Sequence, residues 1–152
     1  MKIYLDCCCF NRPFDDQGQD KIRDEADAIL SIMARCQRAG KVILGSAVLR
    51  MEIARIPNSE KQLKVQMLYA ATSEDVPCTA SVIARAKEMQ SLANIARVDS
   101  LHLASAEAGG ADVFLTTDAE LLRRSQRLQL PMRAMNPVSY LAEVIEHDDD
   151  NN

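Results

Sequence analysis

Short apolar runs alternate along the chain with longer stretches in which apolar residues recur every three or four positions. The short runs are typical of buried strands and the longer stretches of amphipathic helices. Strands are predicted over residues 2–6, 41–44, 112–116 and 132–135, with a brief extended segment at 76–77. A polar loop is expected at residues 11–16. Helices are predicted over residues 20–38, 46–56, 59–72, 80–92, 99–108 and 118–128, and from residue 137 onward.

This order of elements determines the expected fold class. Strands that alternate with helices imply a parallel sheet covered on both faces. We therefore expect an α/β fold, with a central, mostly parallel sheet of four to five short strands flanked by helices. The length of 152 residues is close to the usual size of one domain. The domain is predicted to cover residues 1–145, and the acidic tail 146–152 is predicted to be disordered.

Composition limits where the protein works. No apolar run approaches the roughly 20 residues needed to span a bilayer, and the first residues lack a secretory apolar region. The five cysteines are an odd number, and three of them, Cys7, Cys8 and Cys9, are adjacent, which is not a disulfide framework. We expect a cytoplasmic protein that binds no membrane. The adjacent cysteines could indicate thiol chemistry, but buried cysteines at a strand end are the more ordinary interpretation.

Metal ligands and charge narrow the chemistry further. Zinc is not expected, because the chain has no C-x-x-C pair and its only histidines are His102 and His147. A net charge of −4 argues against a wide basic surface for nucleic acid. Such a substrate would need metal ions and local basic patches. Candidate patches, which could equally be solvated helix faces, contain Arg12, then Arg50, Arg55, Lys61 and Lys64, then Arg123, Arg124 and Arg127.

Four acidic residues carry the candidate chemistry: Asp6, Glu52, Asp99 and Asp118. Each alone is explained as a cap, a strand end or a solvated position. The crevice of an open parallel sheet lies beyond the carboxyl ends of its strands, so these side chains are expected to converge. Carboxylates in close contact repel by about 4 kcal/mol per pair at an effective dielectric near 20, so such a cluster favours a bound cation. Oxygen ligands suit Mg²⁺ (or Mn²⁺), which can promote phosphodiester hydrolysis.

Four pieces of sequence carry a resemblance to a known family. They read KIYLDCCCFNRPFDD at the start, VLRMEIARIP around Glu52, VDSLHLASAEAGGADVFLTTDAELL through Asp99 and Asp118, and MNPVSYL near the end. At these residues the chain resembles the PIN-domain family, including the VapC toxins of toxin–antitoxin pairs. The resemblance implies a magnesium-dependent endoribonuclease with Asp6, Asp99 and Asp118 as metal ligands, and with Glu52 binding through water or orienting the attacking water. It also implies an RNA substrate, a homodimer and, for a toxin, an antitoxin partner.

The same resemblance implies supporting roles. Asn11 looks like a loop residue that contacts metal-bound water or the substrate backbone. Thr116 looks like the hydroxyl that supports the pocket, and with Asn11, Arg12 and Arg124 it completes the predicted substrate-binding set. Glu120 stands where many relatives carry another acid. Cys7 is a departure, because many relatives have Ser or Thr there and a thiol is only a weak donor.

Other interpretations stay open. His102 follows Asp99 by one helical turn and is expected to be a packed or surface histidine, with a general base as the minor alternative. A PIN-like module could bind RNA or a protein without cutting. A phosphatase or receiver domain could use Asp6 as nucleophile or phosphoacceptor. This last alternative is weak, because Asp6-Cys7-Cys8 lacks an Asp-x-Asp pair and no lysine follows the third strand.

Overall fold

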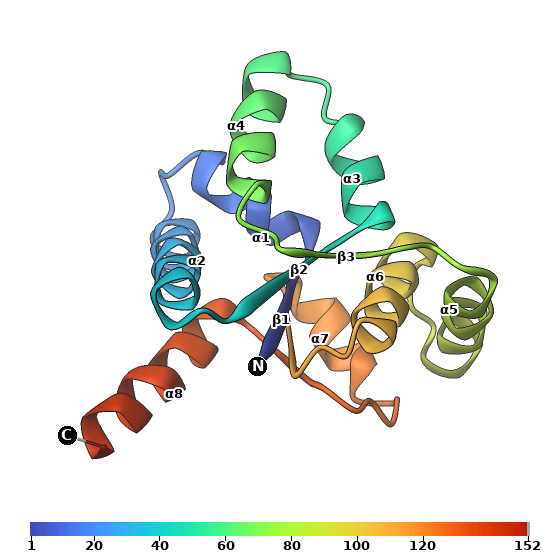
Figure 1. Cartoon of the computed structure of the whole chain (residues 1–152). Helices are drawn as coiled ribbons and strands as arrows, with labels where there is room; N and C mark the ends of the chain where they lie inside the picture. Colours follow the sequence, from blue (N-terminus) through green and yellow to red (C-terminus); the bar gives the residue numbers. More distant parts are fainter. Residues whose placement is uncertain (152) are drawn as a thin grey trace.

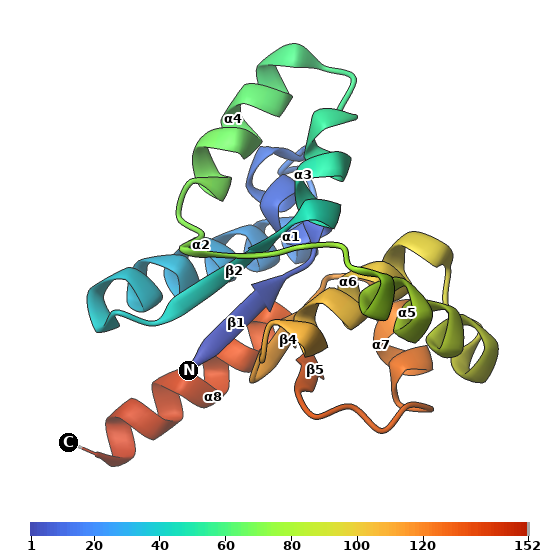
Figure 2. The ribbon, with the colours of Figure 1, turned by 45° about the vertical axis from the view of Figure 1, so that its right-hand side comes forward.

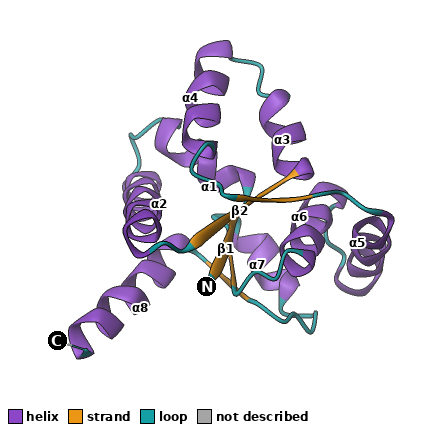
Figure 3. Cartoon of the chain, in the orientation of Figure 1, coloured by secondary structure: helices purple, strands orange, loops and turns teal. Residues whose placement is uncertain are grey.

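A computed structural model describes residues 1–151, and its centre is one parallel sheet (Figure 3). The strands in these residues lie in the order β3-β2-β1-β4-β5, and each pairs in parallel with its neighbour. Their bounds are β1 Lys2–Leu5, β2 Val42–Ser46, β3 Glu74–Val76, β4 Val113–Leu115 and β5 Arg133–Met135. The predicted α/β fold class is therefore confirmed, with a sheet of five strands.

Strand β1 lies at the centre of the sheet. Ile3 is opposite Ile43 of β2 on one side and Val113 of β4 on the other. The strand order reverses between β1 and β4, because β2 and β3 extend to one edge and β5 to the opposite edge. A crevice forms at such a reversal, beyond the carboxyl ends of the strands. Asp6 follows β1 and Thr116 follows β4, so the reversal brings these two residues to the same crevice.

Helices cover both faces of the sheet. Figures 1 and 2 show α2 and α8 on one side and α5, α6 and α7 on the other, while α3 and α4 stand beyond the carboxyl ends of the strands. The helical bounds are α1 Cys7–Asn11, a 3₁₀ turn η1 Arg12–Phe14, α2 Asp20–Ala39, α3 Ala47–Ala54, α4 Ser59–Tyr69, α5 Ala80–Ala93, α6 Arg97–Ala108, α7 Ala119–Ser125 and α8 Pro137–Asp150.

Local polar residues determine where many helices begin and end. The Ser46 hydroxyl accepts from the Leu49 amide at 3.0 Å, and Asn136 accepts from Val138 at 2.8 Å, as their predicted capping roles require. Gly40 ends α2 in the left-handed conformation (φ 66°), which only glycine adopts without strain. These signals are local in sequence, which explains why most predicted helices agree with the structure.

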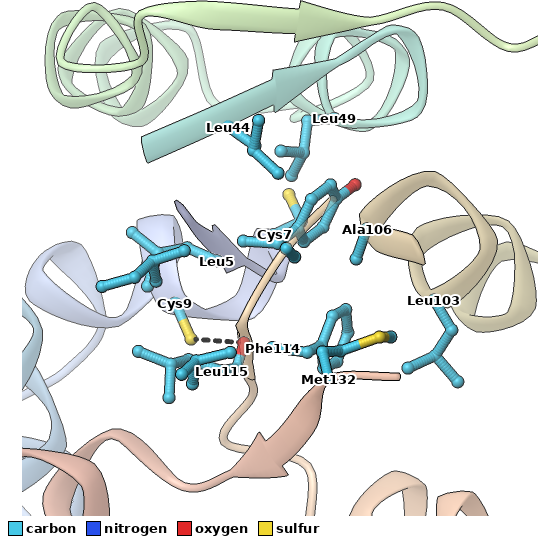
Figure 4. Close-up of a cluster of buried hydrophobic side chains, with 14 of the residues drawn as sticks. Leu5, Cys7, Cys9, Leu44, Leu49, Leu103, Ala106, Phe114, Leu115 and Met132 are labelled. Carbon is cyan, nitrogen blue, oxygen red and sulfur yellow. Dashed lines mark hydrogen bonds between the residues drawn. The ribbon is translucent and has the colours of Figure 1, made fainter. Parts of the chain in front are cut away.

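Apolar side chains on both faces of the sheet form the core. Figure 4 shows Phe114 directed toward Leu103 of α6, while the next residue, Leu115, points the other way toward Leu5 and Cys9. All three residues of β4 are buried, as the continuous apolar run predicted. The α6 helix is buried through most of its length, also as predicted. No helix in residues 1–151 is long and apolar enough to cross a membrane.

Two local predictions are wrong. The segment after β1 is not a plain loop, because Asp6 caps the short helix α1 and Pro13 lies inside η1. The predicted disordered tail is helical through Asp150, and Asn152 lies outside the described residues. The tail is acidic, but Arg35 of α2 pairs with Asp148 at 2.7 Å, and α8 packs along α2. The ion pair is exposed, so it contributes little to stability, and composition alone did not reveal this helical extension.

Candidate metal and active site

Asp6 is a buried carboxylate held in one orientation. The residue is only 5% exposed. One oxygen accepts from the Cys7 amide at 2.7 Å, which is the N-cap of α1. The other oxygen accepts from the Thr116 hydroxyl at 2.9 Å and faces the Cys8 thiol at 3.5 Å. Because the side chain is held from both oxygens, it needs no reorganisation to present its remaining lone pairs to the crevice.

Thr116 connects the ends of β1 and β4. Its fully buried hydroxyl donates to Asp6 and accepts from the Asp118 amide at 3.1 Å. It therefore fixes the position of the Asp118 backbone relative to the Asp6 carboxylate. The predicted hydroxyl contact with the pocket exists, whereas direct substrate contact by such a buried group would require the pocket to open.

Glu52 reaches the same crevice from α3 through a histidine. Its Oε1 is in contact with Nε2 of His102, and Nδ1 of His102 lies 2.7 Å from the Tyr4 hydroxyl. The Tyr4 hydroxyl is also 2.8 Å from Ser46 Oγ. A carboxylate can only accept, so Nε2 carries a proton directed at Glu52. The chain from Ser46 through Tyr4 and His102 thus holds the half-buried Glu52 side chain in the crevice.

The charge of His102 is set by competing effects. Burial alone would lower its pKa, but the hydrogen bond to Glu52 and the nearby charge of Asp6 raise the pKa above its ordinary value. Its Nε2 is 3.7 Å from Oδ1 of Asp6. The expected packed histidine is therefore fully buried as predicted, but it also contacts the acidic centre. Sequence spacing pointed to this possibility, since one helical turn separates His102 from Asp99.

Asp99 lies in the first turn of α6, where the helix dipole favours a carboxylate. Burial, followed by the charges of Asp6 and Asp118, raises its pKa to about 6, and the nearby His102 opposes this shift. Burial is the main cause of the shift, and the charges of Asp6 and Asp118 add to it. A crowded acidic centre of this kind is stabilised by a cation.

Asp118 is more exposed than Asp6 and caps α7. Its Oδ1 accepts from the amides of Glu120 and Leu121 at 3.0 and 3.1 Å. This cap holds the side chain at the rim of the crevice, directly after the Thr116 bridge. Asp118 therefore combines a local structural role with its position beside the acidic centre.

The four predicted acids are not equally close. Oxygens of Asp6 and Glu52 lie within 4.8 Å of each other and of a His102 nitrogen, which is a spacing that one ion could span. Asp99 and Asp118 lie outside this compact group but interact with it electrostatically. Since both His102 nitrogens have protein partners, the carboxylate oxygens are the available donors. Such donors suit magnesium or manganese.

Asn11 supplies a further oxygen beside the acids. It lies with Glu52 and Cys7 on the wall of a groove of about 570 Å³. Its buried Oδ1 has no hydrogen-bond partner within residues 1–151. An unpaired buried acceptor next to carboxylates fits a site that receives a cation with its bound waters. The donor set is thus compatible with a hydrated divalent ion.

Arg12 was predicted to contact substrate, but its guanidinium is occupied by protein groups. It pairs with the buried Glu25 carboxylate at 3.2 Å, with Asp15 at 3.3 Å, and donates to the Thr117 hydroxyl at 3.1 Å. The second Glu25 oxygen accepts from Asn136 at 2.8 Å. These contacts connect η1, α2 and the loop that carries Asp118, which favours a structural role for Arg12.

The other predicted surface groups are also engaged. Arg124 binds Glu120 at 2.7 Å and the Asn94 carbonyl at 2.5 Å, which joins α7 to the end of α5. Hydrogen bonds from Arg123 and then Arg124 lower the pKa of Glu120, whose exposed side chain is paired with these two arginines. Substrate contact by Arg124 stays a prediction, because its guanidinium would first have to leave these partners.

The three adjacent cysteines lie in different surroundings. Burial, with the charges of Glu52 and Asp6, raises the pKa of Cys7 to about 12, so its thiol is unreactive at neutral pH. Cys9 is buried and its thiol faces the Leu115 carbonyl at 3.4 Å (Figure 4). Cys8 is half-buried, 3.4 Å from the Thr116 hydroxyl. Packing accounts for Cys7 and Cys9, as the ordinary interpretation predicted.

The fold and this acidic crevice define an α/β domain whose carboxylates converge at the reversal of a parallel sheet. Comparison with protein families identifies the family to which this domain is related. Residues 3–126 match the PIN domain family model, which covers most of the chain. The protein belongs to the PIN domain family. No curated protein sequence matches it.

Solved structures show the same fold at low sequence identity. VapBC2 from Rickettsia felis, bound to a promoter DNA fragment, aligns with a TM-score of 0.64 and 13% identity over 90% of this chain and 98% of that chain. DNA-bound VapBC from Salmonella typhimurium aligns with a TM-score of 0.56 and 17% sequence identity, over 90% of this chain and 98% of that chain. A toxin–antitoxin complex from Klebsiella pneumoniae aligns with a TM-score of 0.55 and 12% sequence identity, over 86% of this chain and 98% of that chain. These likenesses establish the fold.

The Arg12 network generates a prediction about stability. Glu25→Leu leaves Arg12 without its buried partner and should lower the free energy of unfolding by about 3 kcal/mol. Adding Arg12→Leu should recover much of this loss, because the unpaired charge is removed. Urea unfolding of the two single variants and the double variant measures the coupling. Additive losses would contradict a direct pair.

The raised pKa of Asp99 generates a prediction about pH. The folded metal-free protein holds the Asp99 proton more tightly than the unfolded chain, so the stabilisation from this group is fully present below about pH 4 and is lost as pH rises through about 6. Asp99→Asn removes the charge. In EDTA the variant should match the wild type near pH 4 and melt higher near pH 7. An equal difference in melting temperature between variant and wild type at both pH values would contradict a raised pKa at Asp99.

Proposed function

We propose that the protein is a divalent-metal-dependent endoribonuclease that hydrolyses RNA phosphodiester bonds and acts as the toxin of a toxin–antitoxin pair. The observation that carries this proposal is the convergence of acidic side chains at one crevice, where oxygens of Asp6 and Glu52 lie within 4.8 Å of each other. Membership of the PIN domain family and the toxin–antitoxin assemblies among its structural neighbours support the same function.

Four carboxyl groups are proposed to hold the metal: Asp6, Glu52, Asp99 and Asp118. When bound, magnesium or manganese would acidify a water molecule and neutralise charge that develops on the phosphodiester. Asp6 is preorganised by the Cys7 amide and the Thr116 hydroxyl. Glu52 is oriented by the proton on His102 Nε2. The unpaired Asn11 oxygen can accept from a water or a ribose hydroxyl at the groove wall.

These residues form an acidic site that repels the negatively charged phosphates of RNA. Held carboxylates contribute most when their positions do not change between the resting protein and the transition state. Asp6 and Thr116 satisfy this condition through buried hydrogen bonds. A module that only bound RNA would gain nothing from this repulsive centre, so catalysis is the better explanation of it.

A protein partner is the second part of the proposal. Leu63 and Met67 lie one turn apart on α4 and are 58% and 70% exposed. Apolar side chains grouped on a projecting helix are typical of a protein contact surface. The neighbours from Rickettsia felis and Salmonella typhimurium are VapBC assemblies, which supports an antitoxin as the partner of this chain. The expected homodimer could use the same surface.

Metal removal tests the proposed reaction. Single-stranded RNA should be cut in magnesium or manganese and left intact in EDTA, because the carboxylates alone do not activate water at neutral pH. Asp99→Asn and Asp118→Asn should each reduce the cleavage rate about a hundredfold. Labelled RNA resolved on denaturing gels gives the rates.

An exposed ion pair remote from the crevice supplies the matched control. Glu143 pairs with Arg133 at 2.9 Å on the surface, so Glu143→Gln removes one acidic charge without touching the acidic centre. This variant should keep wild-type cleavage. Cleavage that persists in EDTA, or survives Asp99→Asn unchanged, would show that the acidic centre is not the site of hydrolysis.

A further inference from the structure

Most basic side chains of this protein are neutralised by carboxylates. Eleven of the 18 Lys and Arg side chains form ion pairs within residues 1–151. They include Arg12, Arg123 and Arg124, which belong to the candidate basic patches of the sequence. A polyanionic ligand is attracted mainly by cations that the protein does not already neutralise. The unpaired cations are therefore the informative ones.

Three unpaired cations, Arg55, Lys87 and Arg97, surround one groove. The groove has a volume of about 540 Å³ and lies between α3, α5 and α6. All three side chains are exposed, and none forms an ion pair with any described residue. The other four unpaired cations, Lys21, Arg38, Lys41 and Arg127, do not line this groove. The positive charge is thus concentrated although the whole chain carries a net charge of −4.

This basic groove leads to the acidic centre. Met51, Arg55 and Val98 line both the basic groove and the adjoining groove that contains Glu52 and Asn11. Arg97 precedes Asp99 by two residues on α6. Figures 1 and 2 show α5 and α6 side by side, with α3 next to α6. A strand whose phosphate reached the carboxylates would therefore continue directly between the three cations.

The lining indicates how a strand would be held. Val48, Ile83 and Leu101 provide apolar surface, and the described lining contains no aromatic ring. Bases could bury their faces against this surface but would not stack as they do on aromatic platforms. The cations would supply contacts to phosphates, which carry no sequence information. The chemistry therefore fits the backbone of a single strand better than a specific base.

We propose that the groove bounded by Arg55, Lys87 and Arg97 is the path of the single-stranded RNA backbone as it leaves the acidic centre. This inference rests on the proposed nuclease function and adds where the substrate lies. Charge complementarity is its basis, since phosphates need compensation close to a centre that repels them. Affinity should therefore depend on salt, because each phosphate contact releases counterions.

Direct binding tests the groove separately from cleavage. Fluorescence anisotropy of the full chain with a labelled unstructured RNA of about 12 nucleotides is measured in EDTA at several salt concentrations. Changing all three cations, as Arg55→Gln, Lys87→Gln and Arg97→Gln, should weaken binding at low salt at least tenfold. The slope of log affinity against log salt should become shallower by about 2, since each single-strand contact contributes about 0.7.

A matched triple variant controls for net charge. Arg23→Gln, Arg50→Gln and Arg133→Gln remove three exposed arginines that already have carboxylate partners. This variant should bind RNA with less than a threefold loss and with the wild-type salt slope. Thermal melts of both triple variants check that each is folded. Equal losses in the two triple variants would mean that net charge alone matters, and the path would be wrong.

The remaining outcomes distinguish failure of the proposed RNA path from failure of the proposed nuclease function. Loss of binding in the groove variant, with a wild-type protein that binds but never cuts RNA in magnesium, would support the groove and refute the nuclease. Unchanged RNA binding in the groove variant would overturn the path. If that variant instead lost binding to a labelled acidic helical peptide, the groove would be a protein-docking surface.

Discussion

The hydrogen bond between the Thr116 hydroxyl and the Asp6 carboxylate depends on parallel pairing of β1 with β4, and much of the site depends on it. The register places Leu5 opposite Leu115, so the next residues on each strand meet at the carboxyl edge of the sheet. Thr116 then links Asp6 to the Asp118 amide. One buried hydroxyl thereby determines the separation of two acids that are remote in sequence.

Glu52 is held near this pair by a separate chain of buried polar contacts. Tyr4 is in the central strand, and its hydroxyl contacts both Ser46, which begins α3, and His102 of α6. Because His102 in turn contacts Glu52, the core of the sheet positions a side chain that is itself half-buried. The buried polar chain is satisfied at every step, which is the condition under which such a network orders a site rather than weakening it.

The basic side chains and the acidic crevice of this protein have different electrostatic surroundings. Most cations are neutralised in ion pairs. One of these pairs, between Arg12 and the buried Glu25 carboxylate, supports the loop that carries Asp118. The acidic crevice has the opposite character, because burial and then the charges of Asp6 and Asp118 raise the pKa of Asp99, so its ionised form opposes folding without a cation. The acidic crevice thus destabilises the metal-free protein, and the rest of the fold offsets this loss, as is common at functional sites.

The sequence by itself determined the α/β class, the order of the elements and the candidate acids. These conclusions depend on apolar periodicity, on caps such as Ser46 and Asn136, and on acids next to strand ends. All of these signals are local, so they can be read without knowing the fold.

Only the tertiary structure decided which side chains meet. It placed His102 against Glu52, across 50 positions of sequence, and it tied Arg12 to Glu25 and Thr117 rather than leaving it open to solvent. It also placed Asp148 of the acidic tail against Arg35 of α2. Sequence patterns report the burial of a residue but not its partner, because a charge is equally compatible with solvent, an ion pair or a ligand until the packing of distant elements selects one of them.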